Sequence, residues 1–305
     1  MEKQYKPSID KATALDFAIR DGQKEFGYGY GYEISGKSQY NNYLSNDTWK
    51  RFIDSMSPLH YAQYNDADGG ELIEKKGRWG LNPPKMASFG SSSRLIYECS
   101  KSIPGFCFEK QLPTRVGHTA NLDGYLSCLE EDVFVEAKCR EIYSSHLNQK
   151  ISLVYKDVYE YIKSVNSRFS YEDTPIEDEP DYMACSFLMN DKYISHFDVK
   201  QLICHFLGIC ANILENRANA NVRFIYLIFN PFFDTDFSNS NIQKFESKIK
   251  EEYNETKAEA REFGDFKWLF DAVMSYQSTH LDLPKPQYNF EFALLDQKSY
   301  ALKLI

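Results

Sequence analysis

Two hydrophobic patterns divide this chain of 305 residues into helical and extended segments. Apolar side chains that recur every three or four residues predict amphipathic helices, and short apolar runs between turn residues predict strands. Predicted helices cover residues 8–25, 45–57, 91–103, 150–165, 198–216, 240–262 and 266–276. Predicted strands cover residues 106–113, 119–129, 132–142 and 221–230, with one or two more at 288–295 and 300–305.

Three further segments follow neither pattern. Three alternating glycines in residues 26–33 indicate either a glycine-weakened strand or an aromatic loop. Residues 69–93 are rich in Gly, Pro and Ser and predict a loop. Within it, the cations and the aromatic side chain of residues 75–85 either contact nucleic acid or form an ordinary solvated surface. The acidic, proline-containing residues 171–181 predict a mobile surface loop.

The succession of helix, three strands, helix and strand in the middle of the chain predicts a mixed α/β core. The run at residues 221–230 is apolar on both faces, as expected of a central parallel strand. We therefore expect an N-terminal helical and loop elaboration at residues 1–90. The α/β core would occupy residues 91–235, with an inserted segment at residues 143–197, and C-terminal helices and strands at residues 236–305 would pack on it.

Composition and charge exclude several classes of protein. Hydrophobic residues make up 43% of the chain and aromatic residues 15%, which is enough for a sizeable core and excludes a disordered chain. Because there is no apolar run of about 18 residues and no signal peptide at the N-terminus, we expect a cytoplasmic protein without a membrane partner. The net charge of −9 argues against non-specific coating of nucleic acid, although a local basic rim can serve a site on an acidic protein.

The cysteines and histidines argue against a metal site built on sulfur or imidazole. The seven Cys include no CxxC pair, so reduced thiols are expected. The six His show neither HxH nor HExxH spacing. His205, in an apolar helix, is interpreted as a satisfied core residue, and His118 with Arg115 as either a phosphate contact or part of an ordinary loop. Nucleophile-elbow, P-loop and Rossmann glycine motifs do not occur in the sequence.

Two carboxylates and one lysine are concentrated in two neighbouring predicted strands. Glu136 and Lys138 are two residues apart in a strand, so their side chains project to the same face. A turn between the strands can bring Asp123 beside them. Two hard oxygen ligands can hold Mg²⁺, and a lysine can lie against a metal-activated water. This layout is suited to the hydrolysis of phosphodiesters.

Four Glu-x-Lys triplets occur in the chain, so the triplet alone carries little information. Two fall in the predicted helix 240–262, where residues two apart face different ways, and one falls in the predicted loop 69–93. Glu136 and Lys138 lie in an apolar strand, where charged side chains are costly unless they are paired or ligating. The alternative interpretation is an edge strand with a solvent-facing Glu–Lys pair, and Asp123 in a turn.

Together these residues resemble the PD-(D/E)xK phosphodiesterase superfamily, which has the restriction-endonuclease-like fold. The match consists of Asp123, a 12-residue gap, Glu136–Lys138, the preceding helix and the following helix–strand pair, with Leu122 where the family name has Pro. It covers residues 91–230, a little under half of the chain. The fold that the resemblance implies is a mixed central sheet flanked by helices.

The resemblance implies a role for each matching residue. Asp123 and Glu136 would ligate Mg²⁺, with Mn²⁺ as a substitute, together with the carbonyl oxygen of Ala137. Lys138 would orient or stabilise the attacking hydroxide.

Two further positions are implied by the resemblance but left open by the residues themselves. Many members carry a glutamate on the first core helix, and Glu98 fits that place; Glu109, on the first predicted strand, is the rival acid. Gln201 lies in the first turn of the helix that begins after Asp198. It either belongs to the catalytic face, as in some branches of the superfamily, or is an ordinary polar residue of the first turn.

We therefore expect a Mg²⁺-dependent endonuclease-like enzyme that binds nucleic acid, with DNA ahead of RNA, and a homodimer is compatible with this expectation. Related enzymes leave a 5′-phosphate and a 3′-hydroxyl. The first alternative is a non-catalytic nucleic-acid-binding or assembly protein that keeps the nuclease fold. The second is a structural α/β domain with an exposed Glu–Lys edge pair.

Overall fold

The computed structural model describes residues 30–34, 38–67, 71–77, 80–139, 146–216, 221–230, 240–263 and 266–303. The predicted helix at residues 8–25 and the start of the glycine-rich segment lie outside these ranges. No helix within the described ranges is both long and apolar enough to cross a membrane.

A mixed five-stranded sheet forms the centre of the molecule, in the order β13-β12-β7-β6-β5. Its strands are β5 (Cys107–Pro113), β6 (Thr119–Ser127), β7 (Asp132–Lys138), β12 (Asn221–Ile228) and β13 (Asn289–Asp296). The β5–β6 and β6–β7 pairs are antiparallel, whereas β7–β12 and β12–β13 are parallel. β12 is therefore a central parallel strand, as its apolar sequence predicts.

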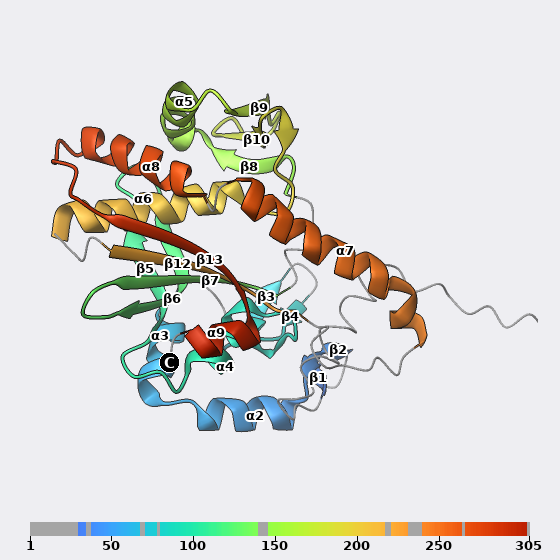
Figure 1. Cartoon of the computed structure of the whole chain (residues 1–305). Coiled ribbons are helices and arrows are strands. Elements are labelled where there is room, and N and C mark those ends of the chain that lie inside the picture. Colours follow the sequence, from blue (N-terminus) through green and yellow to red (C-terminus); the bar gives the residue numbers. More distant parts are fainter. Residues whose placement is uncertain are drawn as a thin grey trace, which may run out of the picture.

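Helices cover both faces of this sheet (Figure 1). On one side lie α6 (Val199–Asn216) and α8 (Lys267–His280), and on the other lie α4 (Ser92–Ser100) and α9 (Gln297–Lys303). The expected mixed sheet with flanking helices is confirmed at this level. Ser91 caps α4 by accepting a hydrogen bond of 3.1 Å from the backbone N–H of Arg94, and Leu95 and Ile96 of this helix are buried.

Gly208 allows α6 to lie close against the β5–β6 hairpin. A Cβ atom at this position would come within 2.9 Å of the Cβ atoms of both Ala120 and Leu112. Real side chains do not approach so closely, so glycine is what lets the helix and the hairpin meet here. The helix that carries Gln201 is thereby held against the sheet.

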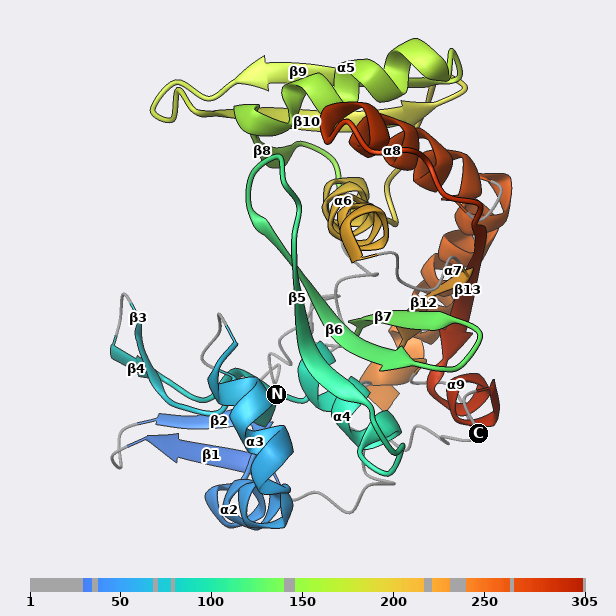
Figure 2. The ribbon, with the colours of Figure 1, turned by 90° about the vertical axis from the view of Figure 1, so that its left-hand side faces the viewer.

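An inserted unit, residues 149–193, forms a second sheet beside α6. Its elements are β8 (Gln149–Ser152), the 3₁₀ turn η4 (Leu153–Tyr155), α5 (Lys156–Val165), β9 (Phe169–Pro175), β10 (Tyr182–Met189) and β11 (Lys192–Tyr193). β10 pairs antiparallel with β8, β9 and β11. In Figure 2 this unit lies above α6, next to the tip of the β5–β6 hairpin.

Two sequence predictions are wrong in part within the inserted unit. The helix predicted at residues 150–165 forms only from Lys156, because β8 pairs with β10 and the turn η4 follows it. The acidic segment predicted as a loop at residues 171–181 begins as strand β9, since Phe169 and Tyr171 are buried and pair along β10. In both cases long-range strand pairing outweighs the local pattern.

The remaining elements lie before and after the core. They are β1 (Tyr30–Ile34), β2 (Ser38–Leu44), α2 (Asn46–Ser55), α3 (Pro58–Asn65), β3 (Lys75–Gly77), β4 (Gly80–Asn82), the 3₁₀ turn η2 (Lys85–Ala87) and α7 (Ser240–Glu262). The described part of the glycine-rich segment is a strand, and the predicted loop 69–93 contains the short β3–β4 hairpin.

Of the one or two strands predicted in the C-terminal segment, β13 forms, and α9 begins directly after it. The Asp296 carboxylate accepts a hydrogen bond of 2.8 Å from the backbone N–H of Ser299, which favours a helix start. Tyr300 then anchors the helix through a contact of 2.8 Å between its hydroxyl and that of Ser100 on α4.

Candidate active site at the fork of β6 and β7

β6 and β7 separate at the two acids that the sequence singles out. Their ladder ends with the pair Gly124–Val135, so Asp123 and Glu136 are the next residues of the two strands. Beyond this point β6 continues beside β5, while β7 continues beside β12 (Figure 2). The Asp123 carboxylate accepts a hydrogen bond of 2.6 Å from the backbone N–H of Ala137, so a side chain occupies the place of a backbone partner. We call the point where β6 and β7 separate the fork.

Glu109 lies in the same row as the two acids of the fork. In the β5–β6 register Phe108 pairs with Gly124 and Lys110 with Leu122, which sets Glu109 opposite Asp123. Three neighbouring strands thus carry one acid each at one level of the sheet.

The backbone of Glu109 is unusual for a strand. Its φ angle is +52°, in the left-handed region. Phe108 and Lys110 are paired with β6, but Glu109 between them is not. For a residue with a Cβ this conformation costs about 1–2 kcal/mol. Such strain is concentrated at functional sites, where the surrounding structure holds it in place.

A buried polar network holds Lys138 beside the fork. Its Nζ lies 2.7 Å from Oε1 of Glu136 and donates a hydrogen bond of 2.6 Å to Oε1 of Gln201. The side chains of Glu136 and Lys138 are only 3% and 8% exposed, so this is no solvent-facing edge pair. Asp198 in turn accepts a hydrogen bond of 2.8 Å from the backbone N–H of Gln201, which fixes the start of α6.

His205 extends this network one helical turn further along α6. Its Nε2 lies 2.9 Å from Oε2 of Glu136. The sequence interpretation of His205 as a satisfied core residue missed this contact. Its spacing of four residues from Gln201 was the available signal, because residues i and i+4 share a helix face.

The electrostatics differ sharply between the acids of the row. Burial opposes ionisation of Glu136, but the electrostatic and hydrogen-bonding interactions with Lys138 and His205 outweigh it and lower its pKa to about 2. Burial, followed by the negative charges of Glu136 and Glu109, raises the pKa of Asp123 well above its ordinary value. Burial and the charge of Glu71 raise the pKa of Glu109 to about 7. One acid is thus held ionised while its neighbours favour a proton.

α4 reaches the row of acids through Ser93 rather than through Glu98. The Ser93 hydroxyl donates a hydrogen bond of 3.2 Å to Oε1 of Glu109. Glu98 is five residues further on, about 140° around a helix of 3.6 residues per turn. There its carboxylate accepts a hydrogen bond of 2.6 Å from Lys101. Of the two auxiliary acids left open by the sequence, the structure therefore brings Glu109 next to Asp123.

The other residues that the sequence offers as phosphate contacts each have a partner within the protein. Lys85, from the basic segment 75–85, pairs at 3.0 Å with the buried carboxylate of Glu71, which acts on Glu109. Arg115 is engaged by both carboxylate oxygens of Glu215 at 2.7 Å. The backbone N–H of His118 donates to the hydroxyl of Tyr155, so this residue belongs to the contact with the inserted unit.

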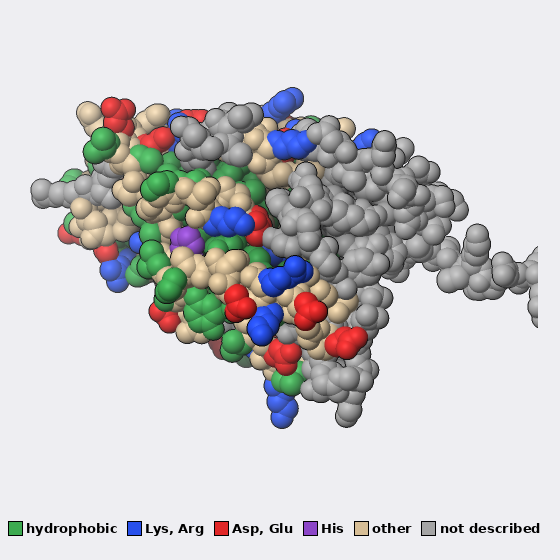
Figure 3. Space-filling view, turned by 90° about the horizontal axis from the view of Figure 1, so that it is seen from below, with side chains coloured by type: hydrophobic (Ala, Val, Ile, Leu, Met, Phe, Trp, Pro, Cys, Tyr) green, Lys and Arg blue, Asp and Glu red, His purple; other side chains and the backbone are tan. Residues whose placement is uncertain are grey.

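Within the described ranges, no group of three or more Asp, Glu, His or Cys side chains is arranged to hold a metal ion. On the face viewed in Figure 3, acidic and basic side chains are interspersed over the described part.

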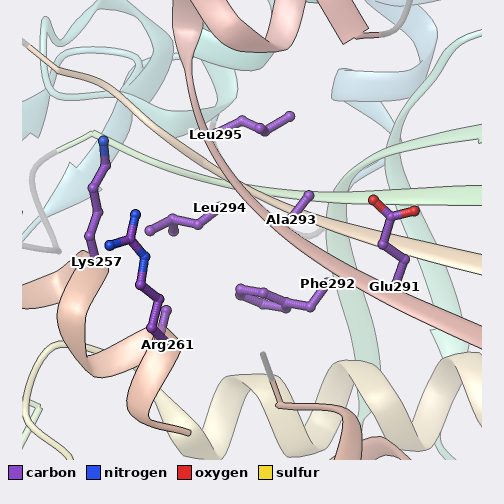
Figure 4. A pocket seen from close by; sticks show the side chains of 8 residues that line it. Lys257, Arg261, Glu291, Phe292, Ala293, Leu294 and Leu295 are labelled. Atoms are coloured by element: carbon purple, nitrogen blue, oxygen red, sulfur yellow. The ribbon is translucent and has the colours of Figure 1, made fainter. Parts of the chain in front are cut away.

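A hollow of about 300 Å³ lies at the β13 edge of the sheet, between α7 and β13. Figure 4 shows Lys257 and Arg261 extending from α7 beside this strand. Because β13 is two strands away from β7, this hollow is separate from the fork.

No protein-family model matches this chain, and no curated protein or solved structure matches it either.

Proposed function

We propose that the protein is a Mg²⁺-dependent phosphodiester hydrolase of the PD-(D/E)xK type, endonuclease-like and acting on DNA. The proposal rests above all on Lys138, which is held between Glu136 and Gln201 beside the carboxylate of Asp123. The succession α4, β5, β6, β7, α6 and β12 supports a restriction-endonuclease-like core, because it follows the order on which the sequence resemblance rests.

The donor set at the fork suits a hard divalent cation. Asp123, Glu136 and the carbonyl oxygen of Ala137 offer oxygen atoms, which Mg²⁺ prefers. Burial and then the neighbouring negative charges raise the pKa of Asp123, and a divalent cation would offset those charges. In the present arrangement Asp123 is engaged by the N–H of Ala137 and Glu136 by Lys138, so an ion would need these carboxylates to turn. When bound, the ion would supply Lewis-acid activation of water and phosphate.

The side chains around the fork have complementary tasks in this proposal. Lys138 would orient the attacking water and stabilise the negative charge that develops on the phosphate. Gln201 and Glu136 hold its ammonium group in place. His205 steadies Glu136 from the other side. Glu109, whose pKa of about 7 lies near neutrality, would bind or release a proton close to the reacting water.

A cleavage screen tests the activity directly. The wild-type protein is incubated with single-stranded, duplex, branched and modified DNA, and with RNA, in Mg²⁺, Mn²⁺ or EDTA. We expect metal-dependent cleavage of at least one substrate, and loss of cleavage in Asp123→Asn and Lys138→Met. If the wild type cleaves none of them with either ion, the enzymatic proposal fails and the non-catalytic nucleic-acid-binding alternative takes its place.

Thermal unfolding supplies a readout that does not depend on substrate. Binding of Mg²⁺ to the folded state alone, at about ten times its Kd, should add about 1.4 kcal/mol and raise the midpoint by a few degrees. Asp123→Asn should abolish this shift, whereas Glu98→Gln should keep it. An equal shift in the wild type and in Asp123→Asn would place ion binding elsewhere.

A further inference from the structure

A pocket of about 200 Å³ lies between the inserted unit and α6, apart from the row of acids. The inserted unit contributes tyrosines and Lys150 to its lining, α6 contributes Lys200 and Cys204, and the β5–β6 hairpin contributes His118. These three segments meet above the central sheet in Figure 2. The nuclease proposal so far gives this pocket no task.

Aromatic rings form much of the pocket wall. Tyr155 and Tyr159 follow β8, and Tyr182 lies on the paired strand β10. The hydroxyl of Tyr155 accepts a hydrogen bond of 2.9 Å from the backbone N–H of His118, which holds this ring against the hairpin. Tyr159 is 1% exposed and packs at 5.4 Å against the ring of Phe187. These rings are therefore held in place before any ligand arrives, and aromatic rings are favoured stacking partners for bases.

Cations accompany these rings. The Nζ of Lys150 lies 4.2 Å from the centre of the Tyr182 ring and also pairs with Glu179. Lys200 is partly buried, and its Nζ lies 3.5 Å from the carbonyl oxygen of Lys150, which links α6 to the inserted unit. Aromatic walls with adjacent ammonium groups suit a ligand that combines a planar ring with a phosphate.

α6 joins this pocket to the fork. Gln201 and His205 face Lys138 and Glu136, whereas Lys200 and Cys204, each one residue earlier, face the pocket. A shift of one residue is a rotation of about 100° around the helix, so the two sites lie on different faces of α6. At a rise of about 3.4 Å per nucleotide, a few nucleotides of one strand span the diameter of a helix, which is about 10 Å.

We propose that this pocket binds an unpaired nucleobase of the nucleic acid whose phosphodiester lies at the fork. The proposal rests on the nuclease function and adds a substrate class: single-stranded DNA, or duplex DNA with an extrahelical base. A base stacked inside a duplex is not available to a pocket of this kind. Lys150, Lys200 and the imidazole of His118 would contact phosphates next to the bound base.

Binding in EDTA tests the pocket separately from cleavage. Fluorescein-labelled DNA of one sequence is prepared as a single strand, as a duplex with one unpaired base, and as a perfect duplex. Anisotropy titrations compare the wild type with Tyr182→Ala and with Ser152→Phe, which fills the pocket from β8. The control is Tyr193→Ala on β11, outside the pocket lining. Circular dichroism confirms that each variant is folded.

The wild type should bind the single strand and the duplex with an unpaired base more tightly than the perfect duplex. Each pocket variant should weaken binding of these two ligands about tenfold, which is within the range for loss of one base–aromatic stack. Tyr193→Ala should bind like the wild type. Folded pocket variants that bind all three DNAs as the wild type does would overturn the proposal.

Two further results separate the related possibilities. In the first, a nucleoside monophosphate protects the wild type and the pocket variants from thermal unfolding to different degrees, while Tyr182→Ala leaves DNA binding unchanged. The pocket would then take a free nucleotide, and the assignment to a nucleic-acid strand would be wrong. If the pocket variants lose DNA binding but the wild type cleaves nothing in Mg²⁺ or Mn²⁺, the base pocket stands and the nuclease proposal fails.

Discussion

Two glutamate–lysine pairs of nearly equal length lie in two different environments of this molecule. At the fork, Lys138 lies 2.7 Å from Glu136, and both side chains are almost completely buried. At the C-terminal end of α4, Lys101 lies 2.6 Å from Glu98, and the lysine side chain is 46% exposed whereas the glutamate side chain is 8% exposed. The same chemical groups at nearly the same distance therefore differ mainly in the access of the lysine to water.

This difference changes how strongly each charge acts on its neighbours. Water screens the half-exposed ammonium group of Lys101, and ion pairs that are open to water contribute little to stability. At the fork, burial makes each charge act strongly on its neighbours, which separates the pKa of Glu136 from those of Asp123 and Glu109. Perturbed acids in such a cluster are a mark of functional sites, although structural networks also perturb them.

The largest expected contrast comes from removing the lysine of each pair. Lys138→Met leaves Glu136 buried without its main partner, so we expect a loss of about 3 kcal/mol in the free energy of unfolding. Metal-dependent cleavage should fall by about a hundredfold or more. Lys101→Met should change stability by less than about 1 kcal/mol. Urea unfolding and initial cleavage rates measure both effects, and equal losses in the two variants would remove the contrast.

Glu109→Gln should alter the dependence of stability on pH. The pKa of Glu109 is about 7 in the folded protein, above its ordinary value of 4.5, so the folded state binds this proton more tightly than the unfolded state. This contribution is fully present below pH 4.5 and is lost as pH rises towards 7, to a total of up to about 3 kcal/mol. The variant lacks the titration and should therefore gain stability relative to the wild type over this pH range.

Urea unfolding at pH 5 and pH 8 measures this difference. Glu98→Gln serves as the matched control and should stay within about 1 kcal/mol of the wild type at both values. A constant offset between Glu109→Gln and the wild type would show that Glu109 does not titrate in this range.

Gln201→Leu should have an intermediate effect, because this residue positions Lys138 and does not itself carry a charge. We expect kcat to fall about tenfold with little change in KM, the pattern for an interaction made in the transition state. Asn212→Leu, further along the same helix, should leave both constants unchanged. A rise in KM with unchanged kcat would instead indicate that Gln201 binds substrate.

The smallest expected effect belongs to Glu98→Gln. Its carboxylate is held by Lys101 on the far side of α4 from Ser93, so cleavage should continue at the wild-type rate. Initial rates in Mg²⁺ measure this. Loss of cleavage would make Glu98 the auxiliary acid, as its position in the sequence favours, and would require α4 to rotate.

Much of the core could be predicted because it depends on local pattern. The three strands around Asp123 and Glu136, the capped start of α4 at Ser91 and the apolar strand β12 all follow from the spacing of apolar and turn residues. The predictions failed where distant partners decide the structure. β8 and β9 form through pairing with β10, where the local pattern predicts a helix and a loop.

The candidate site divides in the same way. The sequence by itself determined that Glu136 and Lys138 share one face of a strand and that Asp123 lies on the preceding strand, because strand alternation and short turns are local. Only the tertiary structure decided that Gln201, 63 residues from Lys138, bonds to it and that His205 faces Glu136. The choice of Glu109 over Glu98 as the neighbour of Asp123, and the aromatic pocket behind α6, likewise depend on strand register and helix rotation, which packing sets between segments far apart in the chain.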